Sequence, residues 1–471
     1  MSKRASVVVD LGFGDAGKGT VVDFLVRDRA ATTVVRFNGG AQAGHNVVTD
    51  DGRHHCFSQL GAGSFVPGVH THLSSHVVVH PTALVVEESR LAAQGVTDAW
   101  TRLSIDERAL VTTPHHQALC RLREIARGDA AHGTTGVGVG ETVRASLEAP
   151  DLALHVRDLR DRAGLARRLA ELRDWCAAQL DGACSDPRWV AEREALLSPR
   201  TNAAWLDALG PLLAARVVVD AEHLTRVLAR ETELVFEGAQ GVLLDEWRGF
   251  HPHTTWSTCT TENALSLLDG WDGEVERLGV LRSYATRHGA GPFPTEVDAL
   301  RQLPEPHNHD VGWQGRFRRG WLDLPLLRYA LACCPVDALA VTHLDRVHPR
   351  WRACVRYEED FAPIPSADPR DLAHAERLGR ALSRATPVLQ PTSPDLVGWL
   401  SAKVSVPVRL TSRSPTARGK RWVTQRPRSA AHAARPRATV PAPKSATMGC
   451  SQMDQTIIQS IRQTKRSGVN G

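Results

Sequence analysis

A glycine-rich segment near the N-terminus carries the residues best suited to chemistry. The sequence GFGDAGK, residues 12–18, fits both GxGxxG and GxxxxGK. Dinucleotide binding requires an acidic residue about 20 positions further on, but no acidic residue stands between Asp28 and Asp50. The segment therefore predicts a phosphate-binding loop, in which backbone N–H groups and Lys18 hold an anion. Asp15, inside this loop, would repel phosphate unless it binds a metal or moves a proton.

The scarcity of lysine singles out Lys18 independently. The chain has six lysines against 51 arginines, and Lys18 is the only lysine between residues 4 and 402. Arginine replaces lysine freely on a surface but not in a tight loop, where a planar guanidinium does not fit. Gly19 stands where a standard phosphate loop has the Ser or Thr that binds magnesium, and Thr20 follows one position late. We therefore expect a modified phosphate loop.

A second flexible segment, NGGAQAGH at residues 38–45, follows the next predicted strand. In a parallel sheet, the loops that follow neighbouring strands share the edge where ligands bind. His45 can therefore face phosphates held by the first loop. Taken alone, this segment would fit better with a surface histidine in a mobile loop.

The elements that position these loops predict an α/β fold. Residues 5–10 and 33–37 are typical of buried strands, and 20–30 has helical spacing between them. We expect a large, mainly parallel central sheet flanked by helices, in a single large domain with subdomain insertions. The same patterns predict a strand pair broken at Pro81 in 77–86, helices at 115–127 and 154–180, and strands at 233–243 and 338–345.

Composition narrows the class of protein. Of 471 residues, 42% are apolar and 23% charged, which is typical of globular proteins, and no apolar run reaches the length of a membrane span. Nine cysteines without a CxxC favour a reduced, cytoplasmic setting. Residues 416–471 hold 11 Lys/Arg and one acidic residue, and they lack hydrophobic periodicity. We expect a folded body over 1–415 and a basic, disordered tail over 416–471, with at most weak nucleic-acid binding by the tail.

Eight segments in order resemble the signature segments of the adenylosuccinate synthetase family. They span residues 7 to about 415, and they are VVVDLGFGDAGKGTVVDFL, VVRFNGGAQAGH, HGTTGVGVG, LVFEGAQGVLLD, SYATRHGAGPFPTE, GRFRRGWLD, THLD and PVRLTSRSP. The resemblance implies a phosphate-loop, GTPase-like fold and a GTP- and Mg²⁺-dependent ligase. Such a ligase joins IMP and L-aspartate through a 6-phosphoryl intermediate and works as a homodimer.

The resemblance also implies roles for single residues. Asp15 is expected to be the base at purine N1 and a magnesium ligand, together with the Gly44 carbonyl. His45 is expected to stabilise charge on the transferring phosphate, Lys18 to neutralise phosphate oxygens, and Gln240 to hold the purine. The nucleotide-binding residues implied are Gly14, Gly17, Lys18, Gly19, Thr20, Asp345, Ser412 and Ser414. The substrate-binding residues implied are Asn38, Thr135, Gln240, Thr255, Gln314, Arg316 and Arg318.

Departures from the family pattern lie mainly at the substrate-binding segments. Trp313 and Gln314 replace paired threonines, and His343 replaces the lysine of the guanine motif. The arginine that crosses the family's dimer to the IMP phosphate has no clear counterpart, with Arg144 the nearest candidate. Two alternatives to the hypothesis of an IMP–aspartate ligase therefore remain open. One is a divergent homologue in specialised metabolism that ligates a different acceptor or amino acid, and the other is a nucleotide-binding module without catalysis.

Overall fold

A run of apolar residues near the N-terminus forms the strand at the centre of the main sheet. The computed structural model describes residues 3–180, 182, 184–308, 310 and 312–423. Strand β1 (Arg4–Asp10) is buried from its second residue onward. It pairs in parallel with β10 (Glu233–Glu237) on one side and with β11 (Glu274–Arg282) on the other. A strand that has a neighbouring strand on each side and a packed core on each face is shielded from water, which explains the nearly continuous apolar sequence ASVVV.

Within the described residues the main sheet has ten strands. Every neighbouring pair is parallel except β18 and β19, which pair antiparallel at one edge. In spatial order the strands are β19 (Lys420–Trp422), β18 (Val408–Ser412), β15 (Ala338–Thr342), β11, β1, β10, β2 (Thr33–Arg36), β5 (His70–Leu73), β7 (Leu103–Asp106) and β9 (Val218–Val219). This large, mainly parallel sheet confirms the predicted α/β class.

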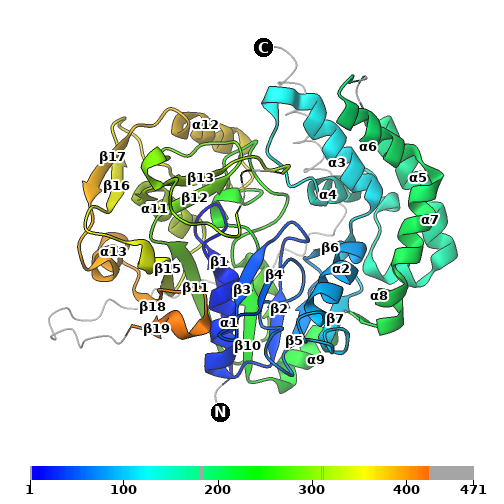
Figure 1. Cartoon of the computed structure of the whole chain (residues 1–471), viewed down its shortest axis with the longest axis horizontal. Coiled ribbons are helices and arrows are strands. Elements are labelled where there is room, and N and C mark those ends of the chain that lie inside the picture. The colour runs from blue at the N-terminus through cyan, green and yellow to red at the C-terminus, as the bar shows by residue number, and fades with distance from the viewer. Residues whose placement is uncertain (1–2, 181, 183, 309, 311, 424–471) are drawn as a thin grey trace.

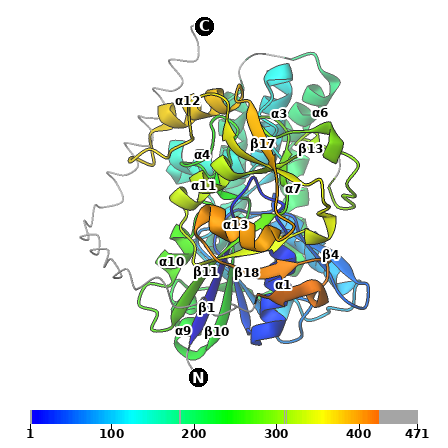
Figure 2. The same ribbon diagram turned by 90° about the vertical axis from the view of Figure 1, so that its left-hand side faces the viewer.

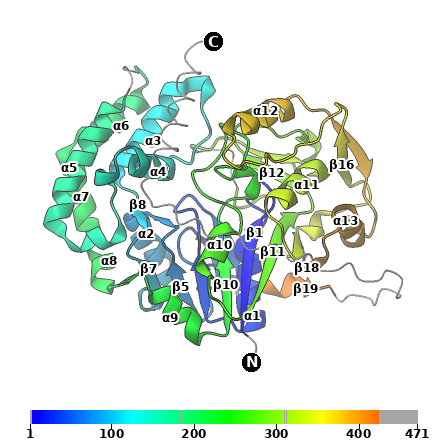
Figure 3. The same ribbon diagram turned by 180° about the vertical axis from the view of Figure 1, so that it is seen from behind.

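The two faces of the sheet carry separate cores. Val8 packs in one core with α1 (Lys18–Arg29), while Val7 and Val9 pack in the other with α9 (His223–Arg230), α10 (Glu262–Leu267) and α11 (Leu324–Cys333). Figure 1 shows α1 in front of the sheet, and Figure 3 shows α9 and α10 on the opposite face. Successive residues of β1 thus anchor opposite layers, as strand geometry requires.

Helical and sheet insertions flank the main sheet at both ends (Figures 1 and 2). The further helices are α2 (Pro81–Ala92), α3 (Pro114–Arg127), α4 (Val139–Glu148), α5 (Arg162–Ala178), α6 (Pro187–Leu197), α7 (Pro199–Ala208), α8 (Gly210–Ala215), α12 (Leu372–Leu382) and α13 (Leu396–Val404). The small sheets pair β3 (His45–Val48) with β4 (His54–Phe57), β6 (Val78–Val79) with β8 (Leu110–Val111), β12 (Ala285–His288) with β13 (Phe317–Gly320), and β16 (Arg352–Tyr357) with β14 (Leu322–Asp323) and β17 (Pro387–Pro391). Among the described residues, no helix is long and apolar enough to cross a membrane.

Three sequence-based boundaries need correction. The helix predicted over 154–180 is divided at Asp161, which ends a short 3-10 helix (Val156–Arg160) and caps α5, so α5 begins only at Arg162. The strand predicted after Pro81 is the helix α2, because proline fits the first helical turn, where its missing N–H is not needed. The tail predicted from residue 416 begins too early, since 420–422 form β19 and pair with β18. The body therefore extends at least to Val423, and the rest of the predicted tail, 424–471, lies outside the described residues.

Candidate active site

The phosphate loop is folded around a buried carboxylate at the end of β1. Asp10 is 1% exposed and accepts hydrogen bonds from the backbone N–H groups of Gly12 (2.8 Å) and Ala16 (2.9 Å). Lys18, the first residue of α1, places its Nζ 3.2 Å from the same carboxylate and donates to the carbonyl of Gln240 at 2.6 Å. Lys18 therefore joins the phosphate loop to the loop after β10. The sequence analysis assigned no role to Asp10, although the sequence places this acidic residue at the end of a predicted strand.

The second loop ends in a buried histidine held by a carboxylate. His45 Nδ1 lies 2.5 Å from Glu237 Oε1, and both side chains are almost fully buried. Burial lowers the pKa of His45 to about 4, although the charge of Glu237 acts in the opposite direction. Burial favours protonated Glu237, but Arg36 and His45 outweigh it and hold the pKa of Glu237 below its ordinary value. Glu237, which the sequence reasoning did not assign, therefore orients His45.

A contact between the two loops places His45 beside the phosphate loop. A Cβ added to Gly19 would come within 2.9 Å of the His45 backbone. Glycine is therefore required where a standard phosphate loop has a hydroxyl residue, because the second loop occupies that space. The predicted juxtaposition of the two loops is confirmed.

Two buried amides near these loops lack partners among the described residues. Gln240 adopts φ 54°, and neither its side-chain oxygen nor its nitrogen is hydrogen-bonded. Gln42 is unpartnered in the same way. Asn38, by contrast, exchanges two hydrogen bonds with the backbone of Ala239, so its amide is already used. Because an unpaired buried amide is costly, Gln42 and Gln240 are better placed than Asn38 to contact a substrate.

Asp15 lies where the phosphate loop meets the 282–308 segment. Its backbone carbonyl accepts a hydrogen bond from Arg282 Nε at 2.6 Å, and Arg282 is held in turn by Glu305. The Asp15 carboxylate is 28% exposed and lies 3.7 Å from His288 Nε2. His288 Nδ1 is buried without a hydrogen-bond partner among the described residues. Sequence reasoning did not single out His288.

The loops that carry Thr135 and Thr255 contact each other. His253 Nδ1 lies 3.5 Å from the carbonyl of His132, and a Cβ added to Gly140 would touch the Trp256 ring at 2.9 Å. These contacts hold the two predicted substrate-binding loops together.

The nearest candidate for the missing cross-subunit arginine is tied down within its own chain. Arg144 Nε donates to Glu148 Oε1 at 2.9 Å, and Arg144 Nη1 lies 3.6 Å from Glu141. It is 13% exposed. Arg144 is therefore not free to reach a partner subunit in this conformation.

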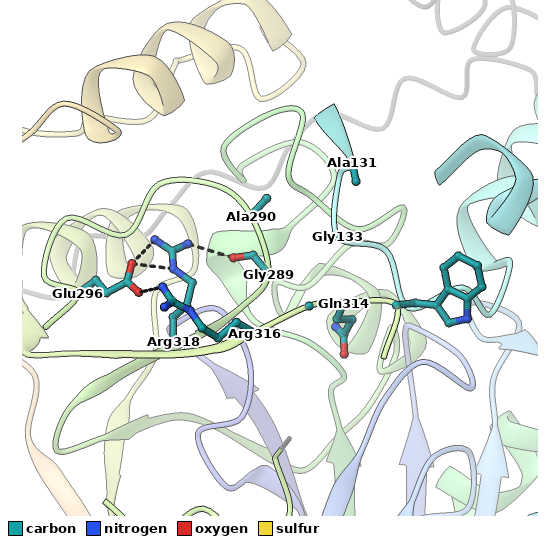
Figure 4. A pocket seen from close by; sticks show the side chains of 10 residues that line it. Ala131, Gly133, Gly289, Ala290, Glu296, Gln314, Arg316 and Arg318 are labelled. Carbon is teal, nitrogen blue, oxygen red and sulfur yellow. Dashed lines mark hydrogen bonds and ion pairs between the residues drawn. The ribbon is translucent and has the colours of Figure 1, made fainter. Parts of the chain in front are cut away.

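A cavity of about 440 Å³ lies beside the predicted amino-acid loop (Figure 4). Gln314, Arg316 and Arg318 line it, as the sequence predicts for one site. Trp313 packs on the neighbouring loop, since a Cβ added to Gly136 would meet its indole at 2.7 Å. The indole thus joins the amino-acid loop to the glycine-rich segment that carries Thr135. The full lining is Ala131, Gly133, Gly289, Ala290, Glu296, Trp313, Gln314, Gly315, Arg316 and Arg318.

The segments predicted to hold the nucleotide base converge on the first turn of α1. Thr20 Oγ1 donates to the carbonyl of Pro415 at 2.6 Å, and Thr342 Oγ1 donates to the carbonyl of Ala16 at 2.7 Å. Asp345, shortly after β15, is paired with Arg346 Nε at 3.0 Å. The loop that follows β18 therefore reaches the first turn of α1, and the last residue of β15 reaches the phosphate loop.

A buried lysine holds the loop after β18. Ser412 Oγ donates to the carbonyl of Ser414 at 3.2 Å. Lys420 is 1% exposed, and its Nζ donates to the carbonyls of Ser414 (3.3 Å), Pro415 (3.4 Å) and Thr416 (2.8 Å). Sequence reasoning placed Lys420 in the tail and missed this role.

Comparisons with known proteins agree on one family. A sequence profile described as adenylosuccinate synthetase matches residues 7–388. The adenylosuccinate synthetase of Thioalkalivibrio sulfidiphilus is 36% identical over 351 residues, covering 73% of this chain and 77% of that protein. The adenylosuccinate synthetase of Myxococcus xanthus is 34% identical over 394 residues, covering 80% of this chain and 86% of that protein. A structure of fully ligated adenylosuccinate synthetase from Plasmodium falciparum superposes with a TM-score of 0.70 at 20% identity, covering 89% of this chain and 99% of that one, and it supports the fold.

Proposed function

The chain belongs to the adenylosuccinate synthetase family, and we propose that its two glycine-rich loops form the catalytic centre. The chain is a GTP-dependent ligase of IMP and L-aspartate, which yields adenylosuccinate, GDP and phosphate. The purine 6-oxygen is a poor leaving group. Phosphorylation by GTP converts it into a good one, which the amine of aspartate then displaces. Such a transfer depends mainly on positioning and charge stabilisation.

In the proposed mechanism, Asp15 accepts the N1 proton of the purine, which makes the 6-oxygen a better nucleophile towards the γ-phosphate. Gln240 supplies its unpartnered amide to the purine ring. Lys18 contributes positive charge at the phosphate loop. His45 is neutral near pH 7 without ligands, because burial lowers its pKa to about 4. A phosphate oxygen beside His45 favours its protonated form, and Glu237 then stabilises the imidazolium.

A magnesium ion fits the oxygen donors at this position. The Asp15 carboxylate is partly exposed, and the Gly44 carbonyl belongs to the adjoining loop. No cluster of three or more His, Cys, Asp or Glu suited to a metal occurs among the described residues. Mg²⁺ typically takes one or two protein oxygens and completes its shell with phosphates and water. When bound, the ion would neutralise negative charge on the phosphates of GTP, and Asp15 and Gly44 would be its protein ligands.

The observation that best supports this assignment is the hydrogen bond from Lys18 Nζ to the Gln240 carbonyl at 2.6 Å. It joins the loop suited to phosphate with the residue suited to the purine, over 222 positions of sequence. We further propose that Asp345, Ser412 and Ser414 hold the guanine base, and that Thr135, Thr255 and Gln42 contact IMP. A cytoplasmic homodimer is the proposed working form.

The test is a phosphate-release assay with purified full-length protein, GTP, Mg²⁺, IMP and L-aspartate. We expect phosphate release to require all three substrates and to disappear in Asp15→Asn. Release with another purine or amine, but not with IMP and aspartate, would favour the divergent homologue. Binding of GTP without any release would favour the non-catalytic module.

A further inference from the structure

The amino-acid cavity contains a carboxylate of the protein itself. Glu296 Oε1 accepts a hydrogen bond from Arg316 Nη2 at 2.8 Å. Glu296 Oε2 accepts from Arg318 Nε at 2.8 Å and lies 2.6 Å from Arg318 Nη2. Figure 4 shows Glu296 facing the two guanidinium groups predicted to bind the substrate. One protein carboxylate therefore bridges both arginines.

Arg318 has no nitrogen left for a substrate in this conformation. Its Nε and Nη2 face Glu296, and its Nη1 donates to the carbonyls of Gly289 at 3.0 Å and Gly291 at 2.9 Å. Arg316 differs, because only its Nη2 has a partner among the described residues. Arg316 is also 49% exposed, against 16% for Arg318. The cavity thus offers free donors from one arginine and carries a net charge of about +1 from this triad.

We propose that Glu296 is a specificity-determining residue that competes with a second substrate carboxylate for Arg316 and Arg318. This inference rests on the proposed function and on the role that the family resemblance implies for these two arginines, which is to bind the amino acid. A substrate with one carboxylate meets the free donors of Arg316. A substrate with two carboxylates needs Glu296 to leave, so that Arg318 can offer the Nε–Nη2 edge of its guanidinium to the second carboxylate.

The surroundings of Glu296 allow such an exchange. Its side chain is 31% exposed, and among the described residues its ion pairs all go to the two arginines. A displaced carboxylate can therefore turn to water, while the arginines keep an equivalent partner in the substrate. The exchange conserves the number of charge-assisted hydrogen bonds, so Glu296 changes the affinity for dicarboxylates without closing the site.

The test measures binding without turnover. Isothermal titration of full-length protein gives the affinities for succinate, which has two carboxylates, and for succinamate, in which a neutral amide replaces one. We expect Glu296→Gln to tighten succinate binding about fivefold and succinamate binding much less. Glu296→Ala should shift the succinate affinity in the same direction.

Asp298→Asn is the matched control, because Asp298 is 88% exposed and pairs only loosely with Arg301 at 3.4 Å. It removes the same charge nearby without touching either arginine. Weaker or unchanged succinate binding in both Glu296 variants, or an equal gain in Asp298→Asn, would overturn the proposal. Loss of GTP-dependent phosphate release in the parent would instead count against the proposed function, since the titration does not depend on turnover.

Discussion

The edge strand β19, which begins at the buried Lys420, leads to a prediction about two truncations. One variant ends at Val423, the last described residue, and the other ends at Gly419. They differ by Lys420, Arg421, Trp422 and Val423. We expect the first to keep the parent's melting temperature and Michaelis constant for GTP, and the second to lose stability and bind GTP more weakly.

The size of the loss follows from the contacts of the removed residues. The Trp422 ring packs 5.8 Å from that of Phe24, and its Nε1 donates to Asp28 at 2.9 Å. Full burial of a large apolar side chain contributes about 1.5–3 kcal/mol, and the partly buried Trp422 belongs near the lower end of that range. The bonds of Lys420 to three carbonyls and of the Val423 N–H to Arg409 (2.8 Å) add about 1 kcal/mol or more each.

A total of about 5 kcal/mol is a large share of the 5–15 kcal/mol that usually stabilises a domain. Removing Lys420 also frees the loop 414–416, so the effect on GTP should exceed any effect on aspartate. Differential scanning calorimetry and steady-state kinetics of both truncations check this. Equal melting temperatures and equal GTP constants for the two variants would refute the reasoning.

The remaining predictions concern the catalytic loops and pH. Asp15→Asn should abolish phosphate release while leaving the circular dichroism spectrum and melting temperature near those of the parent, since Asp15 is a partly exposed loop residue. His45→Ala should also abolish phosphate release and keep the spectrum of a folded protein, but it should lower the melting temperature, because it leaves the buried Glu237 carboxylate without its partner. Activity of either variant within tenfold of the parent would contradict these roles. Lys18→Arg should impair turnover severely, because the larger guanidinium does not fit between Asp10 and the Gln240 carbonyl; near-parental kinetics would show that the lysine is incidental. Burial lowers the pKa of His116 from 6.5 to about 3, so the unfolded chain binds a proton there that the folded chain does not. The contribution of His116 to the free energy of unfolding should be greatest above about pH 6.5 and should decrease as the pH falls towards 4. Urea titrations should show a shallower fall for a folded His116→Gln variant, and an unchanged slope would exclude that histidine as a contributor.

Local patterns predicted the core of the site well. The order strand, glycine-rich loop, helix and strand was readable because periodicity and glycine spacing are local properties. The placement of Asp15, Lys18 and His45 at one sheet edge followed from the geometry of parallel strands. These features need no knowledge of distant contacts.

Features that depend on distant partners were not predictable in the same way. Glu237 orients His45, which lies 192 positions away in the sequence, and Glu296 accepts a hydrogen bond from Arg318, which lies 22 positions away. Asn38 and Gln42 lie in one loop with similar side chains, and only the position of the Ala239 backbone decides which amide is already used. Such outcomes depend on the packed structure, which no local pattern encodes.

The position of β1 at the centre of the sheet also affects how the chain is made. β1 leaves the ribosome long before its two neighbours, which are residues 233–237 and 274–282. Ribosomes add about 5–20 residues per second, so this strand waits from roughly ten seconds to almost a minute for its partners. During that time the apolar edge of ASVVV has no native strand to cover it, which favours capture by chaperones. Nucleotide cannot assist these early stages, because its loop is completed only when Gln240 arrives to accept the hydrogen bond of Lys18.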